Sequence, residues 1–428
     1  MSGIVCAIGL RNAGVHVEIF EQAVNQVFMM TSFQEVGAGV GLGPNALFPL
    51  KELGVLDAVL SKSDEEKPTM RSFRYISATG AHDLIYDVTS SLFHPSNVLI
   101  ICQPSFLEAI VPMLDPRLVH MEKRCISVSA LSSGSHVIHF ADGSTYEADL
   151  VIGADGIKSV IREFVTGRPT SLVYSNSVAY RSVVSPEALK GVKTDMMRPL
   201  CWIGKDKHII SYPVQANQKV RSFYISEADS FNSGKMNLVF FSTDSSVPMG
   251  SVDVPLPWAK PASQDELLHE FSEAGWGEDT KLILKEMKDP SKWYLHLLHP
   301  SLTSYVRQRV VLVGDAAHAM LPHLGAGAGQ GMEDVYALCS LLGDARAQKC
   351  HLDDALKAYD SIRVARANMV QTMSTIAGNI YEKRGPGGGT NAQLREQLKA
   401  IYHPVWHHDL KEEVKRAVAS VYGPRGVL

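Results

Sequence analysis

Residues 309–338, RVVLVGDAAHAMLPHLGAGAGQGMEDVYAL, combine residue types that could bind a flat or phosphorylated ligand. An apolar run ends just before Asp315, a loop with Pro322 follows, and a helix is predicted to open at Glu333. Glycines stand at every second position before that helix: Gly325, Gly327, Gly329 and Gly331. Glycine lets a backbone pass close to a ligand, and a helix N-terminus directs partial positive charge at it. A glycine-rich loop alone is common, whereas this whole arrangement is specific.

A second candidate segment is ADLVIGADGIKSVIREFV, residues 148–165. A predicted buried strand ends at Gly153, and Asp155 and Gly156 precede a helix predicted to begin near Ser159. Ligands of doubly wound sheets bind at the carboxyl ends of strands, beside helix N-termini whose free amides attract phosphate. A DG turn after a strand can also be no more than a turn, and the segment around Asp315 is what favours a ligand site.

The N-terminal stretch MSGIVCAIGLRNAGVHVEIFEQA has the spacing of the second half of a dinucleotide-binding fingerprint. Small or apolar residues from Gly3 onward share one helical face, Gly14 ends the predicted helix, and Glu21 follows a β-branched run. In the complete fingerprint a strand and a Gly-x-Gly turn come first, and the acid binds a ribose. Since that strand and two of the three glycines are absent from this sequence, we expect the central strand of the sheet to be missing.

Composition favours a protein of two or three domains that acts on small molecules. The chain has 428 residues, 45% of them hydrophobic and 20% charged, and its net charge of −4 offers no basic field for nucleic acid. The six cysteines form no CxxC pair, and His403, His407 and His408 lack a helical ligand spacing, so no metal site is predicted. No apolar run reaches the roughly 18 residues of a membrane span, and no signal peptide is evident. We therefore expect a cytoplasmic protein.

Three continuous apolar runs predict strands of one parallel sheet, each followed by glycine or an acid and a helical pattern. They are Val15–Phe20, Leu150–Gly153 and Val310–Val313. Between residues 173 and 297, segments such as HIISYPV, RSFYIS and MNLVFF predict a second sheet. From Leu352 onward, apolar residues three and four apart predict a helical tail.

Together these segments resemble the single-component flavin-dependent aromatic hydroxylases, the group that contains salicylate hydroxylase. The resemblance rests on the acid-terminated N-terminal element, on a DG motif at residues 155–162 and on a GD motif with its loop at residues 314–331. Further similar pieces are EVGAGVGLGPNA at 35–46, AYR at 179–181, HIISYP at 208–213 and AYDSIRVAR at 358–366. The resemblance covers nearly the whole chain in order.

The resemblance implies that FAD is the cofactor. Glu21 would accept the adenosine ribose hydroxyls, Asp315 would hold a ribityl hydroxyl, and the Gly325–Gly331 run would lie against the pyrimidine edge of the isoalloxazine. Gln103 stands where the family usually has an arginine near the pyrophosphate, and glutamine keeps a hydrogen bond but loses the charge. The implied cofactor-binding positions are Gly3, Glu21, Gly37, Gly39, Gln103, Asp155, Gly156, Asp315, Pro322, Gly325, Gly327 and Gly329.

The activity that the resemblance implies has two halves. NAD(P)H passes hydride to FAD, and the reduced flavin takes up O2 to form a C4a-hydroperoxide that hydroxylates a phenolic or hydroxybenzoate-like ring. His208 is the candidate base, although a lone histidine in a strand can also be structural. Arg181 and Tyr212, on neighbouring predicted strands, are candidates to orient a carboxylate or phenol. His318 is interpreted as loop packing rather than as a catalyst.

Alternative functions remain open from the sequence. One keeps the fold but changes the chemistry to epoxidation or another oxidation in secondary metabolism. Another is a truncated, flavin-free remnant, since without the first strand we expect FAD to bind weakly to this chain. The expected partners are a small aromatic substrate and O2, without nucleic acid or a membrane span, in a monomer or homodimer.

The predicted fold class is α/β, with three parts. A discontinuous Rossmann-like FAD-binding domain, three-layered around a parallel sheet that lacks its first strand, takes residues 1–70, 100–170 and 300–345. A β-sheet substrate domain is inserted at residues 71–99 and 171–299. A C-terminal helical segment follows from residue 346 to residue 428.

Overall fold

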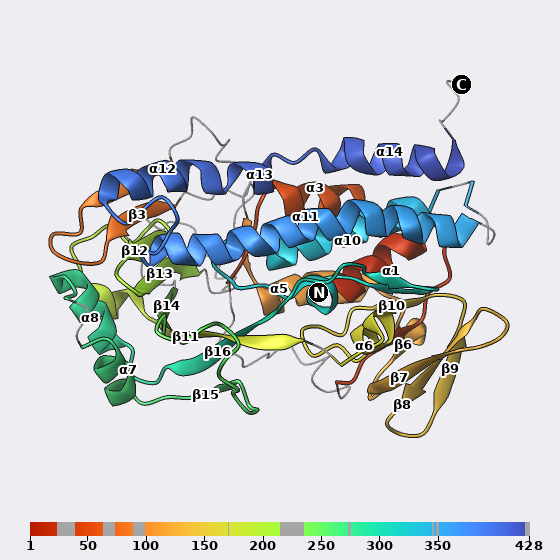
Figure 1. Cartoon of the computed structure of the whole chain (residues 1–428), viewed down its shortest axis with the longest axis horizontal. Helices are drawn as coiled ribbons and strands as arrows, with labels where there is room; N and C mark the ends of the chain where they lie inside the picture. Colours follow the sequence, from red (N-terminus) through yellow and green to blue (C-terminus); the bar gives the residue numbers. More distant parts are fainter. Residues whose placement is uncertain are drawn as a thin grey trace, which may run out of the picture.

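The computed structural model gives the chain an α/β architecture, as predicted (Figure 1). The described residues are 1–23, 39–62, 73–88, 99–169, 171–214, 235–272, 275–344, 346–347 and 351–423. Helices α12 (Asn391–Ile401), α13 (His403–Trp406) and α14 (Leu410–Tyr422) lie in a row along one edge. Beside them run α10 (Gly327–Leu342) and the long α11 (Leu352–Tyr381). Across the described ranges, no helix is both long enough and apolar enough to cross a membrane.

The parallel pairing at the predicted nucleotide site is divided between two small sheets. Strand β10 (Val151–Gly153) pairs in parallel with β18 (Val310–Leu312), which also pairs with β17 (Val306–Arg307). Strand β1 (Ile19–Phe20) pairs in parallel with β6 (Val119–His120) in a separate sheet. The prediction of one sheet containing all three apolar runs is therefore wrong. The physical reason is that no described strand lies between β1 and β10 to hydrogen-bond to both.

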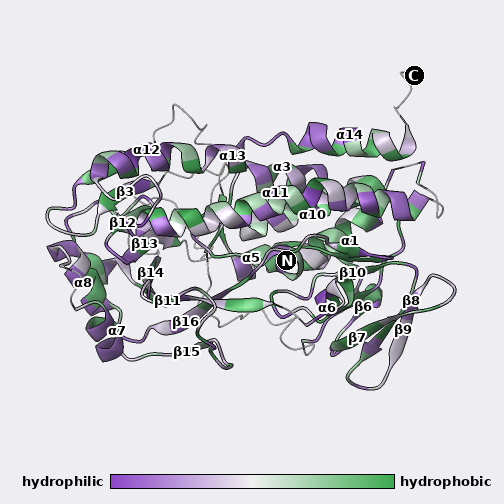
Figure 2. Ribbon diagram, viewed as in Figure 1, coloured by the Kyte–Doolittle hydropathy of each residue, from purple (hydrophilic) through white to green (hydrophobic). Residues whose placement is uncertain are grey.

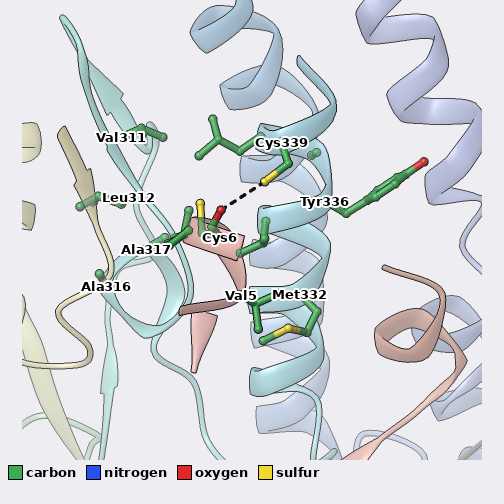
Figure 3. Close-up of a cluster of buried hydrophobic side chains, with 14 of the residues drawn as sticks. Val5, Cys6, Val311, Leu312, Ala316, Ala317, Met332, Tyr336 and Cys339 are labelled. Atoms are coloured by element: carbon green, nitrogen blue, oxygen red, sulfur yellow. Dashed lines mark hydrogen bonds between the residues drawn. The ribbon is translucent and has the colours of Figure 1, made fainter. Parts of the chain in front are cut away.

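Helix α1 (Ser2–Asn12) is packed between β18 and α10 in the largest hydrophobic cluster (Figure 3). Val5 and Cys6 on α1 are buried against Met332 and Cys339 of α10, with the Cys339 thiol 3.7 Å from the carbonyl oxygen of Cys6. This packing fixes the N-terminus of α1 beside the β18 end, where the GD motif begins.

Helix α10 begins at Gly327, six residues before the predicted start at Glu333. The prediction treated Gly327, Gly329 and Gly331 as a loop, but they lie in the first turns of the helix, where they permit close packing. A Cβ on Gly331 would overlap the Ser2 hydroxyl, and one on Gly329 would lie 3.0 Å from the side-chain nitrogen of Asn45. Their lack of a side chain therefore lets α10 approach α1 and α3 (Pro44–Glu52).

An eight-stranded sheet forms the other half of the molecule (Figure 1). In spatial order its strands are β15 (Ala259–Pro261), β16 (Ser291–Leu298), β11 (Leu172–Val184), β14 (Lys235–Thr243), β13 (Lys207–Val214), β12 (Leu200–Ile203), β3 (Arg74–Ser77) and β4 (Leu84–Asp87). One face packs against α7 (Gln264–Glu270) and α8 (Glu278–Glu286). Helix α7 is largely hydrophilic in Figure 2 because only part of its surface meets that core.

The opposite face of this sheet carries the predicted substrate residues in register. Side chains alternate between faces along a strand, so His208 and Tyr212 of β13 share a face, while Ile209 belongs to the α7–α8 core. On neighbouring β14, Phe241 is the register partner of His208 and Asn237 is that of Tyr212. The cluster between this face and helices α11 and α12 closes the core.

Candidate active site and cofactor cradle

A buried carboxylate of α10, that of Asp334, accepts a hydrogen bond from the GD turn. Gly314 has φ of +63°, a conformation that side-chain-bearing residues rarely adopt, and its amide donates to Asp334 Oδ2 at 2.8 Å. His318 Nε2 lies 2.6 Å from the same oxygen, and Arg363 Nε donates to Oδ1 at 2.8 Å. Burial alone would raise the pKa of Asp334, but the neighbouring His318 and Arg363 lower it below its ordinary value. Asp315 is thereby presented at a fixed turn.

A second buried carboxylate extends this network. Glu333 accepts from Arg363 Nη1 at 2.8 Å and from Arg366 Nη2 at 3.0 Å, and all three side chains are buried. Asn45 Nδ2 donates to it at 2.8 Å, which ties α3 to α10. Both arginines belong to the motif at residues 358–366, and their partners were not predicted from the sequence. The signal was present, since two arginines three residues apart on a buried helix face require carboxylates.

Arg162 joins the DG motif to the GD motif. Its buried guanidinium donates to the carbonyl oxygens of Ala316 at 3.0 Å and Asp315 at 3.3 Å. Burial lowers the pKa of Arg162 to about 10, against the opposing effect of nearby carboxylates. Asp155 accepts from Ser159 Oγ at 2.6 Å and from the Val160 amide at 2.8 Å. Through these hydrogen bonds Asp155 stabilises the turn in which it lies. Its contact with a cofactor stays a prediction.

The predicted cofactor residues Glu21 and Asp315 both lie near the N-terminus of α1. Burial lowers the pKa of the Met1 amino group, and the charges of Asp315 and Glu21 both raise it, so both carboxylates lie close enough to act on it. Asp315 Oδ1 also lies 4.0 Å from where a Cβ on Gly327 would be, which brings this carboxylate to the first turn of α10. The two acids thus flank a single region.

Two helix N-termini face this region without a side-chain cap from the described residues. Neither α1 nor α10 has an acidic residue in its first turn. Gly325, with φ of +60°, has no described atom within 4 Å of its would-be Cβ, and both Gly325 and Pro322 are exposed. Open space and uncapped amides at a helix N-terminus suit an anionic or carbonyl-rich ligand.

The remaining predicted cofactor positions have different surroundings. Gly3 packs the first turn of α1 on the DG segment, since its would-be Cβ lies 3.0 Å from the Ala154 Cβ. Gly39 of β2 (Gly39–Leu42) pairs with the last residue of β5 (Leu99–Cys102), next to exposed Gln103, the first residue of α5 (Gln103–Ile110). Gly156 has φ of +77° and open space beside it. Gly37 lies outside the described residues.

Arg181 and Tyr212 belong to a polar end of the substrate face. Arg181 Nε donates to Asn237 Oδ1 at 3.1 Å, and Tyr212 donates to the Gly39 carbonyl oxygen at 3.2 Å. Asn237 is fully buried, and its Nδ2 has no hydrogen-bond partner within the described part of the chain. Asn237 was not predicted as a site residue, although its alternation with Leu238 and Val239 in MNLVFF could have placed it on this face.

His208 lies at the other end of the same face. Its ring is fully buried, with Nδ1 3.0 Å from Glu382 Oε1 and Nε2 unpartnered as far as the chain is described. Phe241 stacks on the ring at 4.4 Å between centroids and an interplanar angle of 3°. His323, which follows Pro322, lies 5.2 Å away between ring centroids. The structure thus brings the GD loop to the candidate base.

His323 adjoins the candidate base and was not predicted as a site residue. Burial, together with His208 and Arg384, lowers the pKa of His323 well below its ordinary value, so the ring is neutral. Gly378 on α11 makes room for it, because a Cβ there would lie 2.7 Å from His323 Nε2. The position of His323 directly after Pro322 was a signal that could have identified it. No such local signal exists for Glu382, which is 174 residues from His208 along the chain.

These groups fit FAD. Two carboxylates near the α1 N-terminus can accept ribose and ribityl hydroxyls, and the uncapped amides of α1 can receive a diphosphate. The open space at Gly325, beside the N-terminus of α10, suits the pyrimidine edge of a flavin. Asp334 and Glu333 are occupied by arginines and position these elements rather than binding ligand.

Comparison with known proteins identifies the family of the chain. A family model described as an FAD binding domain matches residues 1–374. Salicylate hydroxylase from Pseudomonas putida is 36% identical over 98% of this chain and 93% of its own length. A 6-methylsalicylate 1-monooxygenase from Aspergillus terreus is 28% identical over 98% of this chain and 90% of its own length.

Solved structures show the same fold. A salicylate hydroxylase substrate complex matches with a TM-score of 0.82 and 31% identity, covering 97% of this chain and 95% of that one. Klebsiella pneumoniae HpxO complexed with FAD and uric acid matches with a TM-score of 0.68 at 20% identity, over 99% of this chain and 95% of that one, which supports the fold alone. The chain belongs to the FAD-dependent aromatic hydroxylases, the flavoprotein monooxygenase family that includes salicylate hydroxylase.

Proposed function

We propose that this FAD-dependent monooxygenase hydroxylates a small phenolic acid of the hydroxybenzoate class, consuming NAD(P)H and O2. The observation that carries the proposal is the pair of polar ends on one sheet face. Arg181 and Asn237 form one end, and His208 with Glu382 forms the other. His208 and Tyr212 are four residues apart on β13, so their Cα atoms are about 13 Å apart, with partly exposed Ile210 between them. We infer that one aromatic ring binds along this face, with its carboxylate toward Arg181 and its phenol toward His208.

The residues on this face have complementary tasks. When bound, FAD supplies electrons from NAD(P)H and activates O2. The Arg181 guanidinium and the Asn237 amide bind the substrate carboxylate through charge-assisted hydrogen bonds. His208 receives the phenol proton at Nε2. A phenol has a pKa of about 10 and a free imidazole about 6.5, so the proton moves only as the ring is attacked.

The apolar part of the face keeps water away from the reacting ring. Val239 is the register partner of both Arg181 and Ile210, and Phe241 covers His208. The names of the relatives, which include hydroxylases of salicylate and 6-methylsalicylate, support the same substrate class. We place the protein in the cytosol as a monomer or homodimer, with Cys6, Cys125, Cys201 and Cys339 as free thiols.

Oxidation of NADH and NADPH by the FAD-loaded protein tests the proposal. It is measured against a panel of hydroxybenzoates, larger phenols and non-phenolic aromatic acids, with product masses determined. We expect hydroxybenzoates to stimulate oxidation and to yield products whose mass shows one oxygen atom inserted, with or without loss of CO2. Stimulation by non-phenolic substrates alone, or the absence of any oxygenated product, would overturn the proposal.

A further inference from the structure

Glu382 is a buried carboxylate in an electrostatically unfavourable place. It is the C-cap residue of α11, and its side chain is 1% exposed. The C-terminus of a helix carries partial negative charge, so a carboxylate there is disfavoured, and burial adds a desolvation penalty. Such a group persists only when its partners compensate for both costs.

The Glu382 side chain contacts the candidate base itself and two further polar groups. Oε1 lies 3.0 Å from His208 Nδ1 and accepts from Thr243 Oγ1 at 3.0 Å. Oε2 accepts from Arg384, whose guanidinium also lies 3.5 Å from Asp206. The carboxylate is therefore fixed against the edge of the His208 ring that faces away from the phenol-binding side proposed above.

The ring itself is fixed from several elements. Phe241 stacks on one face of the His208 ring. The ring of Tyr381 lies 5.5 Å from the His208 ring between centroids, at an interplanar angle of 63°. With Nδ1 at Glu382, the opposite nitrogen, Nε2, is buried and makes no hydrogen bond to any described residue. A buried ring nitrogen without a partner costs free energy unless a ligand satisfies it.

We infer that Glu382 is a positioning residue for the hydroxylation: it holds the Nδ1–H of His208 and thereby leaves Nε2 of His208 to receive the substrate proton. This inference rests on the proposed function in assigning His208 as the base. In the step, the phenol O–H bond breaks, its proton forms the Nε2–H bond, and the electron pair stays on the phenol oxygen. Glu382 then faces the imidazolium that results and stabilises it, as a carboxylate does behind a catalytic histidine.

Among the described titratable groups around His208, Glu382 is the one that can hold the Nδ1–H. The groups that face or adjoin it are Tyr381, Glu382 and Arg384 from the end of α11, His323 from the GD loop, Cys201 from β12 and Asp206 from the turn before β13. His323 is kept neutral, since burial lowers its pKa, and burial raises the pKa of Cys201. Asp206 faces Arg384, so Glu382 is the carboxylate in contact with the ring.

Glu382→Gln tests whether the charge of Glu382 is needed in addition to its hydrogen bond, because glutamine keeps the shape and an acceptor oxygen but not the charge. We expect kcat to fall by at least about tenfold with KM changed less than about twofold. The acid limb of the pH profile of kcat/KM should move to lower pH, because protonated His208 loses its counter-charge. Glu382→Asp, which keeps the charge, should recover the position of that limb.

Glu270→Gln is the matched control. Glu270 binds Lys207 and Ser242, the sequence neighbours of His208 and Thr243, but from the opposite face of the sheet. We expect its kcat and pH profile to match those of the wild type. If Glu382→Gln keeps the wild-type kcat and pH profile, or if Glu270→Gln reproduces its defect, the inference is wrong.

A second readout does not depend on turnover. Long-range 15N–1H spectra of histidine-labelled protein, with His208 assigned from a His208→Gln sample, report which ring nitrogen carries the proton. We expect the Nδ1–H tautomer in the wild type, and an Nε2–H tautomer there would overturn the inference even if Glu382→Gln failed to fold. Lack of phenol-dependent oxidation by the wild type would instead refute the proposed function.

Discussion

The Gly314 amide donates to Asp334 Oδ2 at 2.8 Å. This hydrogen bond connects the turn that carries Asp315 to a buried residue of α10. The same carboxylate contacts His318 and Arg363, so one buried acid connects the GD turn, the short helix that follows it and α11. The position of Asp315 depends on this connection, since no side chain of its own turn performs the same task within the described residues.

Asp334→Asn should therefore weaken both the fold and the cofactor site. Arg363 would lose one of its two carboxylate partners in a fully buried setting, and breaking such a pair costs about 3 to 5 kcal/mol of unfolding free energy. Urea unfolding measures this, and flavin absorbance after dialysis measures retained FAD. Asp354→Asn removes an exposed acid of the first turn of α11 that pairs with exposed Lys357; it should lower the unfolding free energy by less than about 1 kcal/mol and leave FAD retention unchanged.

Gly331→Ala should destabilise the packing of α10 on α1. The added methyl group would overlap the Ser2 hydroxyl and approach the Gly314 Cα at 3.4 Å, so the helices must separate. Overpacking of this kind costs about 1 to 3 kcal/mol, to be measured as a change in unfolding free energy. Gly41→Ala, where no described atom lies within 4 Å of the new Cβ, is the comparison. Equal stabilities of the two variants would refute the close-packing explanation.

Stability should fall as the pH drops below about 6.5, partly because of His323. Burial lowers its pKa in the native state, so below that pH the unfolded chain binds more protons and gains stability relative to the native state. The contribution is at most about 1.4 kcal/mol per pH unit. Glu333 and Asp334, whose pKa values are lowered, act below this window. Urea unfolding between pH 5 and 7 should show a smaller slope for His323→Gln, and an unchanged slope would contradict a neutral His323.

Asn237→Ala should impair binding of carboxylate-bearing substrates. The variant removes the amide that accepts from Arg181, so both the orientation of the guanidinium and one hydrogen-bond donor are lost. We expect KM for hydroxybenzoates to rise about tenfold, equivalent to about 1.4 kcal/mol, with a smaller effect on kcat. Phenols without a carboxylate serve as the control and should show unchanged KM. A similar rise for both substrate types would contradict the assignment of this end of the face.

The sequence predicted the parts of the site that depend on local patterns. The turns that carry Asp315 and Asp155, and the strand of His208, could be predicted because acids and apolar runs at strand ends follow short-range rules, whereas the binding roles of these residues stay predictions. The start of α10 was placed wrongly because glycine favours loops locally, and its role in helix packing depends on Ser2 and Asn45, far away in the chain. Glu382 could not have been found, since its approach to His208 requires α11 to be placed on the sheet.

The placement of β1 has a similar explanation. A continuous apolar run from Val15 predicts a strand, but pairing depends on which neighbours are present, and only Ile19 and Phe20 find a partner in β6. Local propensity thus identified the element but not its sheet.

The central claim is that Glu21 and Asp315 hold opposite parts of one FAD molecule, and calorimetric titration with FAD and with FMN, which lacks the adenosine, tests it most directly. Wild-type protein is compared with Glu21→Gln and Asp315→Asn. We predict that Glu21→Gln weakens FAD about tenfold but leaves FMN unchanged, whereas Asp315→Asn weakens both by a similar factor. If Glu21→Gln weakened FMN as much as FAD, or if neither variant affected FAD, the two carboxylates would not share one cofactor and the account would be contradicted.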